Sequence, residues 1–450
     1  MEDTIAAVAT TIGESSINVI RISGKESINV ANKIFSKDIS NVPSHTVHYG
    51  FIVENNEKID EVFLSVFRTP KSFTTEDVVE ISVHGGSASV NKVMELVLSN
   101  GARLAEPGEF LKRAFLNGRI DLTQAESVGD LINAQTESSR KMALKGVDKT
   151  IFCEINELKE KVLALIANIE VNIDYPEYED AVVVTKEMIN DTNEFIRDKV
   201  NKLLKNSKKG LLIKNGLKIV IVGKPNVGKS SILNSLLKEN KAIVTDIKGT
   251  TRDIVEGTLM IDGVKLDILD TAGIRETNDV VEAIGVKRSV DAIEEADLVL
   301  FVIDSEEGFN YEDKEVLDKI KDKEILVVYN KNDKKDNYKV DELSSYNSIN
   351  ISTFDNDMIE KLKDKISSIF DLKSIAESNY TYISNARQIA LLNKSLSIID
   401  EIENAVNNDL EVDMIEIDVK RLWETLGEIT GEVGSDDLLN EIFSKFCLGK

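Results

Sequence analysis

The chain has 450 residues, too many for one compact core, so its length favours two to four domains of about 100–200 residues each. Its composition, 42% hydrophobic and 30% charged residues with five prolines, is typical of a globular protein and excludes a disordered or fibrous one. The formal net charge of −24 argues against general coating of nucleic acid, because so acidic a chain repels phosphate groups.

The cysteines and the chain start restrict the compartment. Cys153 and Cys447 lie too far apart in sequence for a CxxC metal site or a disulfide framework, which favours a reducing compartment. The longest apolar runs have the length of strands, and Glu2 and Asp3 stand where a secretory leader would carry basic residues. We therefore expect a cytoplasmic protein without a membrane span.

The first part of the chain mixes short strands with one helical stretch. The ranges 17–22, 62–67 and 78–83 are apolar runs of strand length, and 90–98 has helical periodicity, with glycine and proline between them. This pattern predicts an α+β domain over residues 1–118.

Long helices follow. Apolar residues recur at spacings of three and four from Ile151 to Ile169, which predicts the buried seam of a packed helix that ends near Pro176. A second helix is expected to run to about Asn206. Residues 199–218 contain seven lysines and no acidic residue, which indicates either a solvated helix face and linker or a patch that contacts phosphate groups.

From Leu217 onward, strands alternate with helical segments, which predicts a parallel sheet with helices on both faces. The expected strands are 218–222, 266–269, 298–303, 325–329 and 349–352. Beyond residue 374 the chain is helical again, with amphipathic stretches at 391–406 and 415–429. Because the helices on either side most simply pack together, we expect an α/β domain inserted into a discontinuous helical domain. The expected domain ranges are 1–118, 119–214 (helical), 215–373 (α/β) and 374–450 (helical).

A phosphate-binding loop is predicted at Gly223–Ser230, where GKPNVGKS matches the GxxxxGK[ST] pattern between a strand and a helix. Glycines let backbone N–H groups face the phosphates, and the helix N-terminus adds partial positive charge. In such a loop Lys229 reaches the outer phosphates and Ser230 supplies an oxygen to magnesium.

Two further motifs indicate a guanine nucleotide. The Asp-Thr-Ala-Gly motif 270–273 closes one strand, which places Asp270 near the magnesium and the Gly273 amide near the γ-phosphate. The Asn-Lys-Asn-Asp motif 330–333 closes another, and the Asp333 carboxylate can accept both N1–H and the exocyclic amine of guanine, groups that adenine lacks there. With Thr251 between them as a second magnesium ligand, the order of motifs predicts a Ras-like GTPase.

Other positions depart from the Ras-like pattern. The last guanine-contacting loop, usually Ser-Ala-Lys, reads Ser352-Thr353-Phe354, which leaves a backbone amide to make the contact. Ile274 stands where a glutamine usually orients the attacking water, so other groups must position water and neutralise charge. Glu282 is a candidate for the first role, and Asn226 with the carbonyls of residues 245–251 could hold a monovalent cation for the second.

Several motifs outside the GTPase signatures carry a resemblance that runs from Asp3 to Lys450. They are DTIAA (3–7), RISG (21–24), EDVVE (76–80), HGG (84–86), EPGEF (106–110), NGRIDL (117–122) and FCLGK (446–450). In these motifs the chain resembles the MnmE (TrmE) family of tRNA-modification GTPases.

The resemblance implies a multidomain α/β and α+β architecture: an N-terminal domain that binds formyl-tetrahydrofolate, a discontinuous helical domain and an inserted GTPase domain. It also implies a homodimer through the N-terminal domains and a heterotetramer with the flavin-dependent protein MnmG. That complex would add a carboxymethylaminomethyl or aminomethyl group to carbon five of the wobble uridine of certain tRNAs, with potassium in place of an arginine finger.

The resemblance also assigns residues. It implies potassium ligands at Asn226, Thr245, Ile247 and Thr250, a water-orienting Glu282, magnesium ligands at Ser230 and Thr251, and a folate site of Arg21, Glu80, Arg119 and Lys450. Cations suit the carboxylates of a folate, and a carboxylate suits its pterin. The role of Cys447 stays open. GTP contacts are expected at Asn226, Val227, Gly228, Lys229, Ser230, Ser231, Thr245, Asp246, Ile247, Lys248, Gly249, Thr250, Thr251, Asp270, Thr271, Ala272, Gly273, Asn330, Lys331, Asn332, Asp333, Ser352, Thr353 and Phe354.

Two other functions remain to be weighed. One is a GTP-controlled ribosome or RNA assembly factor, which would bind RNA in a salt-dependent manner and usually carries a basic appendage. The other is a folate-binding protein with a vestigial GTPase domain, which the intact Lys229, Ser230 and Asp333 disfavour.

Overall fold

The structure is a computed structural model that describes residues 3–11, 13, 15–174, 184–238, 257–270, 291–335, 338–377, 383–433 and 436–449. The chain divides into two compact units. Unit 1 comprises Met1–Gly129, Lys145–Arg197 and Ala390–Lys450, and unit 2 comprises Asp130–Leu144 and Asp198–Ile389.

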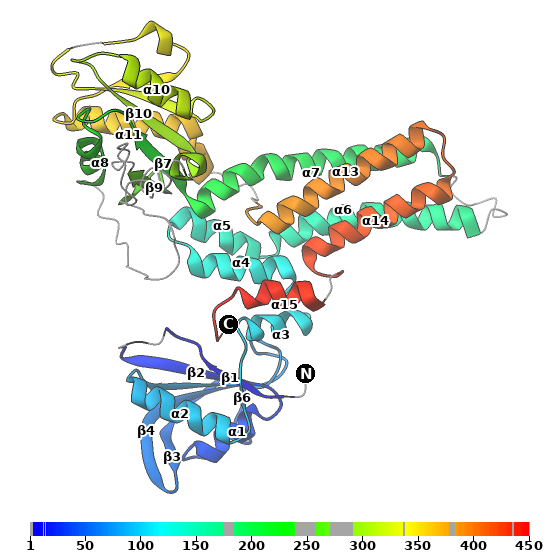
Figure 1. Cartoon of the computed structure of the whole chain (residues 1–450). Helices are drawn as coiled ribbons and strands as arrows, with labels where there is room; N and C mark the ends of the chain where they lie inside the picture. The colour runs from blue at the N-terminus through cyan, green and yellow to red at the C-terminus, as the bar shows by residue number, and fades with distance from the viewer. Residues whose placement is uncertain are drawn as a thin grey trace, which may run out of the picture. The chain divides into compact units, whose positions relative to one another are not determined.

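Unit 1 contains a six-stranded sheet in the order β3-β4-β5-β2-β1-β6. Its strands are β1 (Ile5–Val8), β2 (Ile17–Ser23), β3 (Thr46–Glu54), β4 (Glu57–Phe67), β5 (Val78–His84) and β6 (Arg103–Leu104). Neighbouring strands are antiparallel except β1 and β6, which are parallel. Helices α1 (Ser27–Ile34) and α2 (Ser87–Ser99) lie against one face, where alternate strand residues such as Ile20, Leu64 and Ile81 form the core (Figure 1).

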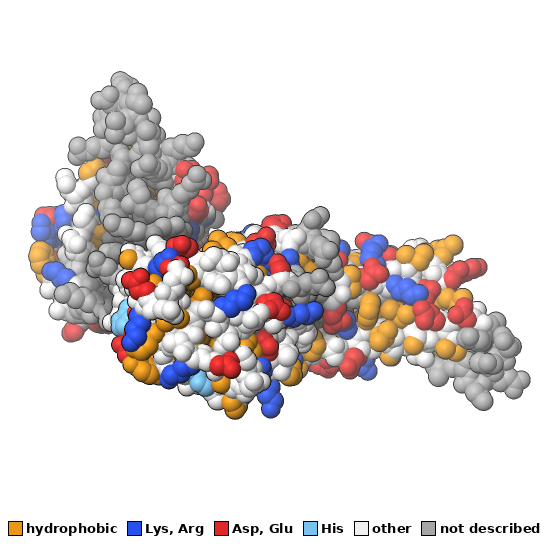
Figure 2. Space-filling view, turned by 90° about the horizontal axis from the view of Figure 1, so that it is seen from below, with side chains coloured by type: hydrophobic (Ala, Val, Ile, Leu, Met, Phe, Trp, Pro, Cys, Tyr) orange, Lys and Arg blue, Asp and Glu red, His pale blue; other side chains and the backbone are white. Residues whose placement is uncertain are grey.

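The alternate residues of these strands point to the other face of the sheet, because successive side chains of a strand alternate. Arg21 pairs with Glu80 across β2 and β5, and Tyr49 pairs with Phe63 across β3 and β4. Val47, Tyr49 and Phe63 are 64%, 47% and 54% exposed, so this face carries apolar side chains at its β3–β4 edge. On the molecular face shown in Figure 2, hydrophobic side chains are interspersed with acidic and basic ones.

Helices form the rest of unit 1. Helix α6 (Thr150–Asp174) packs along α14 (Val412–Thr430), and α3 (Glu109–Leu116) packs on α15 (Asp436–Ser444). The first contact joins segments far apart in sequence through a seam that includes Ile155, Val162 and Ile169. The helices α4 (Leu122–Asn133), α5 (Glu137–Val147), α7 (Lys186–Asn215) and α13 (Ala386–Asn407) cross the boundaries between the units in sequence.

Unit 2 contains a second six-stranded sheet in the order β12-β11-β10-β7-β9-β8, parallel except for the β8–β9 pair. Its strands are β7 (Leu217–Val222), β8 (Gly257–Ile261), β9 (Val264–Asp270), β10 (Leu298–Asp304), β11 (Ile325–Asn330) and β12 (Asn347–Asn350). Helices α8 (Lys229–Lys238) and α11 (Asn356–Phe370) pack on one face and α10 (Tyr311–Ile320) on the other, so both faces are buried.

The predicted fold class is confirmed: an α+β N-terminal part, helices from two parts of the chain and an intervening α/β sheet. The strand predicted at 349–352 was displaced, because β12 ends at Asn350 and the chain then turns, with Asp355 N–H donating to the Ser352 carbonyl. Four strands, β1, β3, β6 and β8, were not predicted. The predicted domain limits stay predictions, since unit 1 joins the N-terminal sheet with helices from other parts of the chain.

Two further expectations concern the surface of the molecule. Within the described ranges, every helix is too short or too polar to cross a membrane. In the lysine-rich stretch, Lys209 and Lys214 of α7 form ion pairs with Asp371 and Asp130, at 3.7 Å and 2.7 Å. Lys218 of β7 pairs with Glu295 at 2.5 Å. These three lysines of the stretch therefore form ion pairs with acidic side chains of unit 2.

Candidate nucleotide site and a second site in the N-terminal sheet

The phosphate-binding loop lies between β7 and α8, at the carboxyl end of a central strand. Gly223 and Gly228 have φ angles of 151° and 99°, and a methyl group at either would lie 2.5 Å from the Val302 carbonyl oxygen or 2.2 Å from Asn330 Nδ2. Glycine is therefore required at both positions. Asn226, at φ 64°, also adopts the left-handed conformation, which asparagine tolerates better than most residues.

Lys229 begins α8 and reaches back over this loop. Its Nζ donates to the carbonyls of Gly223 and Lys224 at 2.8 and 2.9 Å, so the ammonium lies where the loop curls. Ser230 and Ser231 occupy the first turn of the same helix and are exposed, so their hydroxyls are accessible beside the helix N-terminus. The loop, the ammonium and the hydroxyls together match what a magnesium–nucleotide complex requires.

A buried ion pair fixes the outer side of the loop. Lys224 is 6% exposed, and its Nζ lies 3.0 Å from Glu307 and 3.5 Å from Asp313 of α10. Burial disfavours the charged ammonium, but the two carboxylates outweigh that cost and raise the pKa of Lys224. Asp313, which is fully buried, has its own pKa raised by burial. The pair ties the phosphate loop to the segment that follows β10.

The guanine motif 330–333 follows β11 and contacts the phosphate loop directly. Asn330 Nδ2 donates to the Val227 carbonyl at 2.8 Å. The Ser352 hydroxyl donates to Asp333 Oδ1 at 2.6 Å, which orients the carboxylate predicted to read the base. Asn332 N–H donates to the Ile351 carbonyl, so the loop after β12 is held against the motif.

Lys331 pairs with Asp304, the residue that ends β10, at 2.5 Å. Burial alone would raise the pKa of the Asp304 carboxyl, but Lys331 and neighbouring backbone N–H groups lower it overall. Phe354 is 90% exposed, and the Ser352 hydroxyl accepts a hydrogen bond from its N–H at 3.4 Å. Thr353 lies between them and is half-buried.

Part of the predicted nucleotide and cation site falls on residues that the structure does not describe. The stretch 245–251, the motif residues 271–273 and the catalytic candidate Glu282 lie outside the described residues. For Asp270, only the backbone is described: it ends β9 and pairs with Ile221, one strand position from the phosphate loop. That register places the Asp270 main chain beside the loop, and the role of its carboxylate stays a prediction.

A second group of predicted residues comes together on the open face of the N-terminal sheet. Arg21 Nε donates to Glu80 Oε1 at 2.8 Å, and Arg21 also donates to the Gly449 carbonyl at 3.3 Å. The guanidinium groups of Arg21 and Arg119 lie 5.2 Å and 4.9 Å from the centre of the Phe73 ring. Two of the four predicted folate residues thus make cation–π contacts with one aromatic side chain, and a third, Glu80, is joined to them through Arg21.

Residues near the C-terminus also lie beside Arg21. Gly449 has a φ of 88°, and a methyl group there would lie 2.5 Å from the Val8 carbonyl oxygen. The Cys447 carbonyl accepts from Gly108 N–H at 3.3 Å, and the Cys447 thiol is exposed. Lys450 lies outside the described residues, but its neighbour Gly449 touches Arg21.

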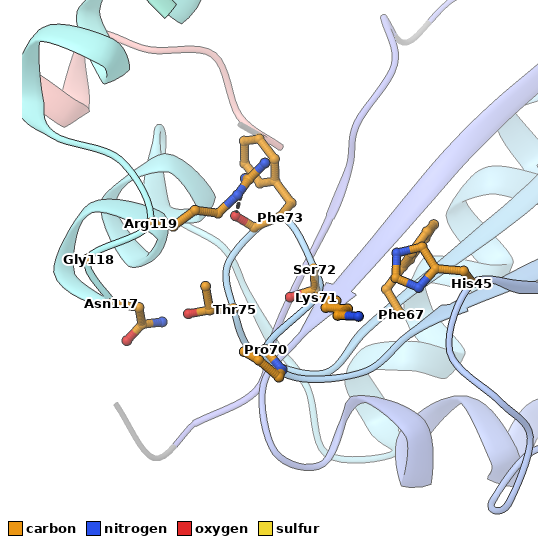
Figure 3. Close-up of a pocket in the computed structure, with 10 residues that line it drawn as sticks. All are labelled: His45, Phe67, Pro70, Lys71, Ser72, Phe73, Thr75, Asn117, Gly118 and Arg119. Carbon is orange, nitrogen blue, oxygen red and sulfur yellow. Dashed lines mark hydrogen bonds between the residues drawn. The ribbon is translucent and has the colours of Figure 1, made fainter. Parts of the chain in front are cut away.

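Phe73 belongs to the loop between β4 and β5, which borders a cavity of about 580 Å³. Figure 3 shows Arg119 and Phe73 on one side of this cavity and His45 and Phe67 on the other, with the loop 70–73 between them. The Arg119 side chain donates to the Phe73 carbonyl, and surrounding atoms desolvate its guanidinium and lower the pKa of Arg119. Arg119 remains a cation at physiological pH, because an arginine pKa starts far above it.

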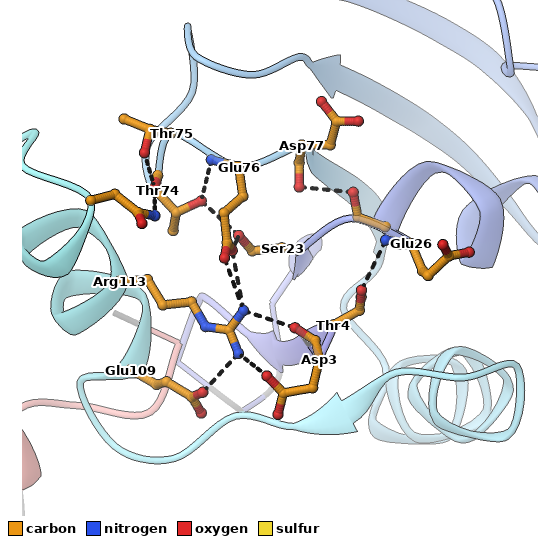
Figure 4. A network of polar contacts seen from close by, with 12 residues as sticks. Asp3, Thr4, Ser23, Glu26, Thr74, Thr75, Glu76, Asp77, Glu109 and Arg113 are labelled. Carbon is orange, nitrogen blue, oxygen red and sulfur yellow. Dashed lines mark hydrogen bonds and ion pairs between the residues drawn. The ribbon is translucent and has the colours of Figure 1, made fainter. Parts of the chain in front are cut away.

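A buried guanidinium holds this loop (Figure 4). Arg113 of α3 is 1% exposed and donates to Glu76, to Glu109 and to both the carboxylate and the carbonyl of Asp3, at 2.9–3.2 Å. Glu76 in turn accepts from the Ser23 hydroxyl at 2.7 Å, and Ser23 shares a 2.6 Å hydrogen bond with Thr74. Residues on β2, α3 and the chain start therefore meet behind the loop.

Comparisons with known proteins identify the family of the chain. A family profile described as "MnmE helical domain" matches residues 122–447, and one described as "GTP-binding protein TrmE N-terminus" matches residues 4–119. The chain belongs to the MnmE family.

Curated members of this family match the whole chain. It is 48% identical over 450 residues to the tRNA modification GTPase MnmE of Streptococcus thermophilus, covering 100% of this chain and 98% of that protein. It is 46% identical to the MnmE of Streptococcus mutans, with 100% and 99% covered. Among solved structures, Aquifex aeolicus Era bound to GDP and aluminium fluoride is 31% identical, covering 40% of this chain and 66% of that chain, with a TM-score of 0.28.

Some residues of these two candidate sites were not predicted. Phe73 has no local pattern that marks it, since an aromatic residue in a loop acquires its role only when two distant arginines reach it. Asp304 did carry a signal, because it ends a fully apolar strand at the edge of the sheet where the nucleotide motifs gather.

We predict that Arg113→Met lowers the free energy of unfolding by about 3–5 kcal/mol at pH 7, because it removes a buried cation, leaves Glu76 without its ion-pair partner and leaves Glu109 with Arg103 alone. The pKa of Glu109 is lowered in the fold: burial alone would raise it, but Arg103 and Arg113 outweigh that effect. The stability from this carboxylate is therefore present above its unfolded pKa and lost as pH falls, so the loss in Arg113→Met shrinks toward pH 4.

Urea unfolding of the full chain at both pH values measures this difference. Arg421→Met is the matched control, because Arg421 pairs with Glu401 and Asp418 at the surface, where such pairs contribute about 0–1 kcal/mol. Equal losses in the two variants would show that the Arg113 network does not hold the N-terminal sheet.

Proposed function

We propose that this chain hydrolyses GTP and that the hydrolysis cycle serves the modification of the wobble uridine of tRNA. The observation that supports the GTPase part most directly is the Asn330 hydrogen bond to Val227, which joins the guanine motif to the phosphate loop at 2.8 Å. Support for the tRNA part comes from the relatives, since the curated proteins 45–48% identical to this chain are tRNA modification GTPases.

The residues around the phosphate loop suit a magnesium ion. The accessible Ser230 hydroxyl at the start of α8 and the position of Asp270 at the end of β9 are the donors that such an ion takes beside a nucleotide. Thr251 would be the other protein ligand. Bound there, magnesium would neutralise charge on the β- and γ-phosphates. Lys229 would bind the outer phosphates, and Asp333, oriented by Ser352, would select guanine.

Charge neutralisation at the bond that breaks requires a further cation, because an aliphatic Ile274 follows the Asp-Thr-Ala-Gly motif. We assign this role to potassium held by Asn226, Thr245, Ile247 and Thr250. The exposed Asn226 side chain, projecting from the phosphate loop at φ 64°, is compatible with it. Glu282 would orient the attacking water.

GTP hydrolysis in potassium and in sodium, at equal ionic strength, tests the cation. We expect a rate about tenfold or more higher in potassium, because a cation at the transferring phosphate stabilises the transition state. Asn226→Gly should abolish the difference: it removes the amide oxygen, while glycine accommodates the left-handed backbone that would strain alanine. Equal rates of the wild type in both salts would contradict the assignment.

The second site supports a folate as the carrier of the one-carbon group. Arg21, Arg119 and Lys450 offer cations, Glu80 offers a carboxylate for the amine and N–H groups of a pterin, and Phe73 offers a flat apolar surface. A formyl-tetrahydrofolate has all three kinds of group. The complex partners would be a second copy of the chain and the flavin-dependent MnmG, acting together on tRNA in the cytoplasm.

The open face of the N-terminal sheet supports the homodimer. Val47, Tyr49, Phe63 and Ile17 are 64%, 47%, 54% and 58% exposed, and all four lie on the face that carries Arg21 and Glu80. Association through this face would remove apolar surface from water, which is the main driving force for forming protein dimers. The alternative of a ribosome assembly factor loses support, because the family profiles match both the N-terminal and the helical parts of the chain.

We predict that Glu80→Gln weakens binding of 5-formyltetrahydrofolate by about tenfold or more, because a carboxylate accepting from a pterin is a charge-assisted pair and an amide is not. Isothermal titration of the full chain measures this affinity. Glu95→Gln is the control, since Glu95 is an exposed residue of α2 on the opposite face of the sheet. Unchanged affinity in Glu80→Gln would remove Glu80 from the site.

A further inference from the structure

The cavity beside Phe73 extends away from the Arg21–Glu80 pair and differs from it in character. Ten residues line it, and of these only Phe73 and Arg119 belong to the Arg21 group. His45, Phe67, Pro70 and Lys71 form the rest of its apolar and basic lining, together with small and polar residues. The cavity therefore continues the candidate folate site into a region to which no role has been assigned.

Its walls suit a flat apolar group. Phe67 and Phe73 come from the end of β4 and from the loop after it, and Pro70 lies between them (Figure 3). The His45 ring meets Phe67 edge to face at a centroid distance of 5.4 Å, which fixes that wall. An aromatic ring bound beside Phe73 could therefore contact apolar side chains from Phe73 to Phe67.

Its charge suits an anion. Lys71, Arg119 and His45 are among the lining residues, and none of the ten residues that line the cavity is acidic. This composition is unusual in a chain with a net charge of −24. Lys71 is exposed and lies in the loop 70–73 between the two walls (Figure 3). Its long side chain lets the ammonium reach an anionic group of a ligand at the solvent-exposed side of the cavity.

The loop that carries Lys71 and Phe73 is rigid for a structural reason. Thr75 has a φ of 61°, a conformation that a β-branched residue adopts only when its surroundings force it. Here Thr69 donates to the Thr75 carbonyl and Asn117 Nδ2 to the Thr74 carbonyl, at 2.6 and 2.7 Å. With the Arg113 network behind it, the cavity wall is formed before a ligand arrives, which reduces the entropy lost on binding.

We propose that this cavity is a subsite for the acyl tail of the folate: its aminobenzoyl ring lies along Phe73 toward Phe67, and the carboxylates of a polyglutamate tail pair with Lys71. The inference rests on the folate part of the proposed function. It adds that the site prefers folates with several glutamates over the monoglutamate, because each added carboxylate is attracted to the same basic rim.

Titration of the full chain with 5-formyltetrahydrofolate carrying one or three glutamates tests the preference. We expect the triglutamate to bind about three- to tenfold more tightly, since an exposed ion pair contributes up to about 1 kcal/mol and a factor of ten in affinity corresponds to about 1.4 kcal/mol. The preference should shrink as salt rises, because the paired charges are exposed to solvent.

Lys71→Met should reduce the ratio of the two affinities to near one. Lys58→Met is the matched control, since Lys58 is an exposed lysine of the same sheet whose ammonium lies over Phe51, outside the cavity lining, and it should keep the wild-type ratio. A ratio is unaffected by a general loss of folded protein, which would lower both affinities alike.

The outcomes separate the two proposals. Equal affinity of the wild-type chain for both ligands, or a preference that survives in Lys71→Met, would overturn this subsite while leaving the folate site in place. Failure of the wild-type chain to bind either ligand would overturn the folate site and the subsite together.

Discussion

The hydrogen bond from Asn330 to the Val227 carbonyl joins the two loops on which nucleotide recognition depends. It exists because β7 and β11 both flank β10, so their carboxyl ends open at the same edge of the sheet. It requires Gly228, since any side chain there would collide with the Asn330 amide. Through this contact, a loop that would bind phosphates and a motif that would read the base form one surface.

Both candidate sites also share a physical feature, a buried cation whose ion pairs hold a loop in place. In unit 2, Lys224, a residue of the phosphate loop itself, pairs with Glu307 and Asp313. In unit 1, Arg113 lies beneath the β4–β5 loop and pairs with Glu76 and Glu109. Buried ion pairs contribute little net stability, but removing one partner is costly, so they fix a conformation strongly. Each loop can then present its outer groups to a ligand without first becoming ordered.

Site residues that belong to one short motif could be predicted from the sequence, whereas residues that only the fold brings together could not. The phosphate loop and the motif 330–333 could be predicted, because glycines, strand and helix occur within a few residues of one another. Arg21 and Glu80 are neighbours only through the pairing of β2 and β5, and spacing alone does not reveal that pairing. Their assignment came from the family resemblance, and the structure brings them together.

Other features could not be predicted from local patterns. The role of Phe73 depends on two arginines that approach it from β2 and from the segment after α3. Strand β3 was missed, although its residues alternate in burial, because glycine and histidine interrupt its apolar character. The last strand was predicted too far along the chain, at 349–352. Ile351 still donates a strand-like hydrogen bond to the Tyr329 carbonyl after the β11–β12 pairing has ended, so its sequence resembles that of a strand.

Asp333 is expected to make this chain specific for guanine, and the chain to hydrolyse the bound nucleotide. The most direct test compares GTP and xanthosine triphosphate hydrolysis by the wild type and by Asp333→Asn. The variant should lose activity on GTP by about a hundredfold or more and gain activity on the xanthine nucleotide, because an amide can donate to the carbonyl that replaces the guanine amine. An unchanged preference for GTP in Asp333→Asn would exclude this role of Asp333.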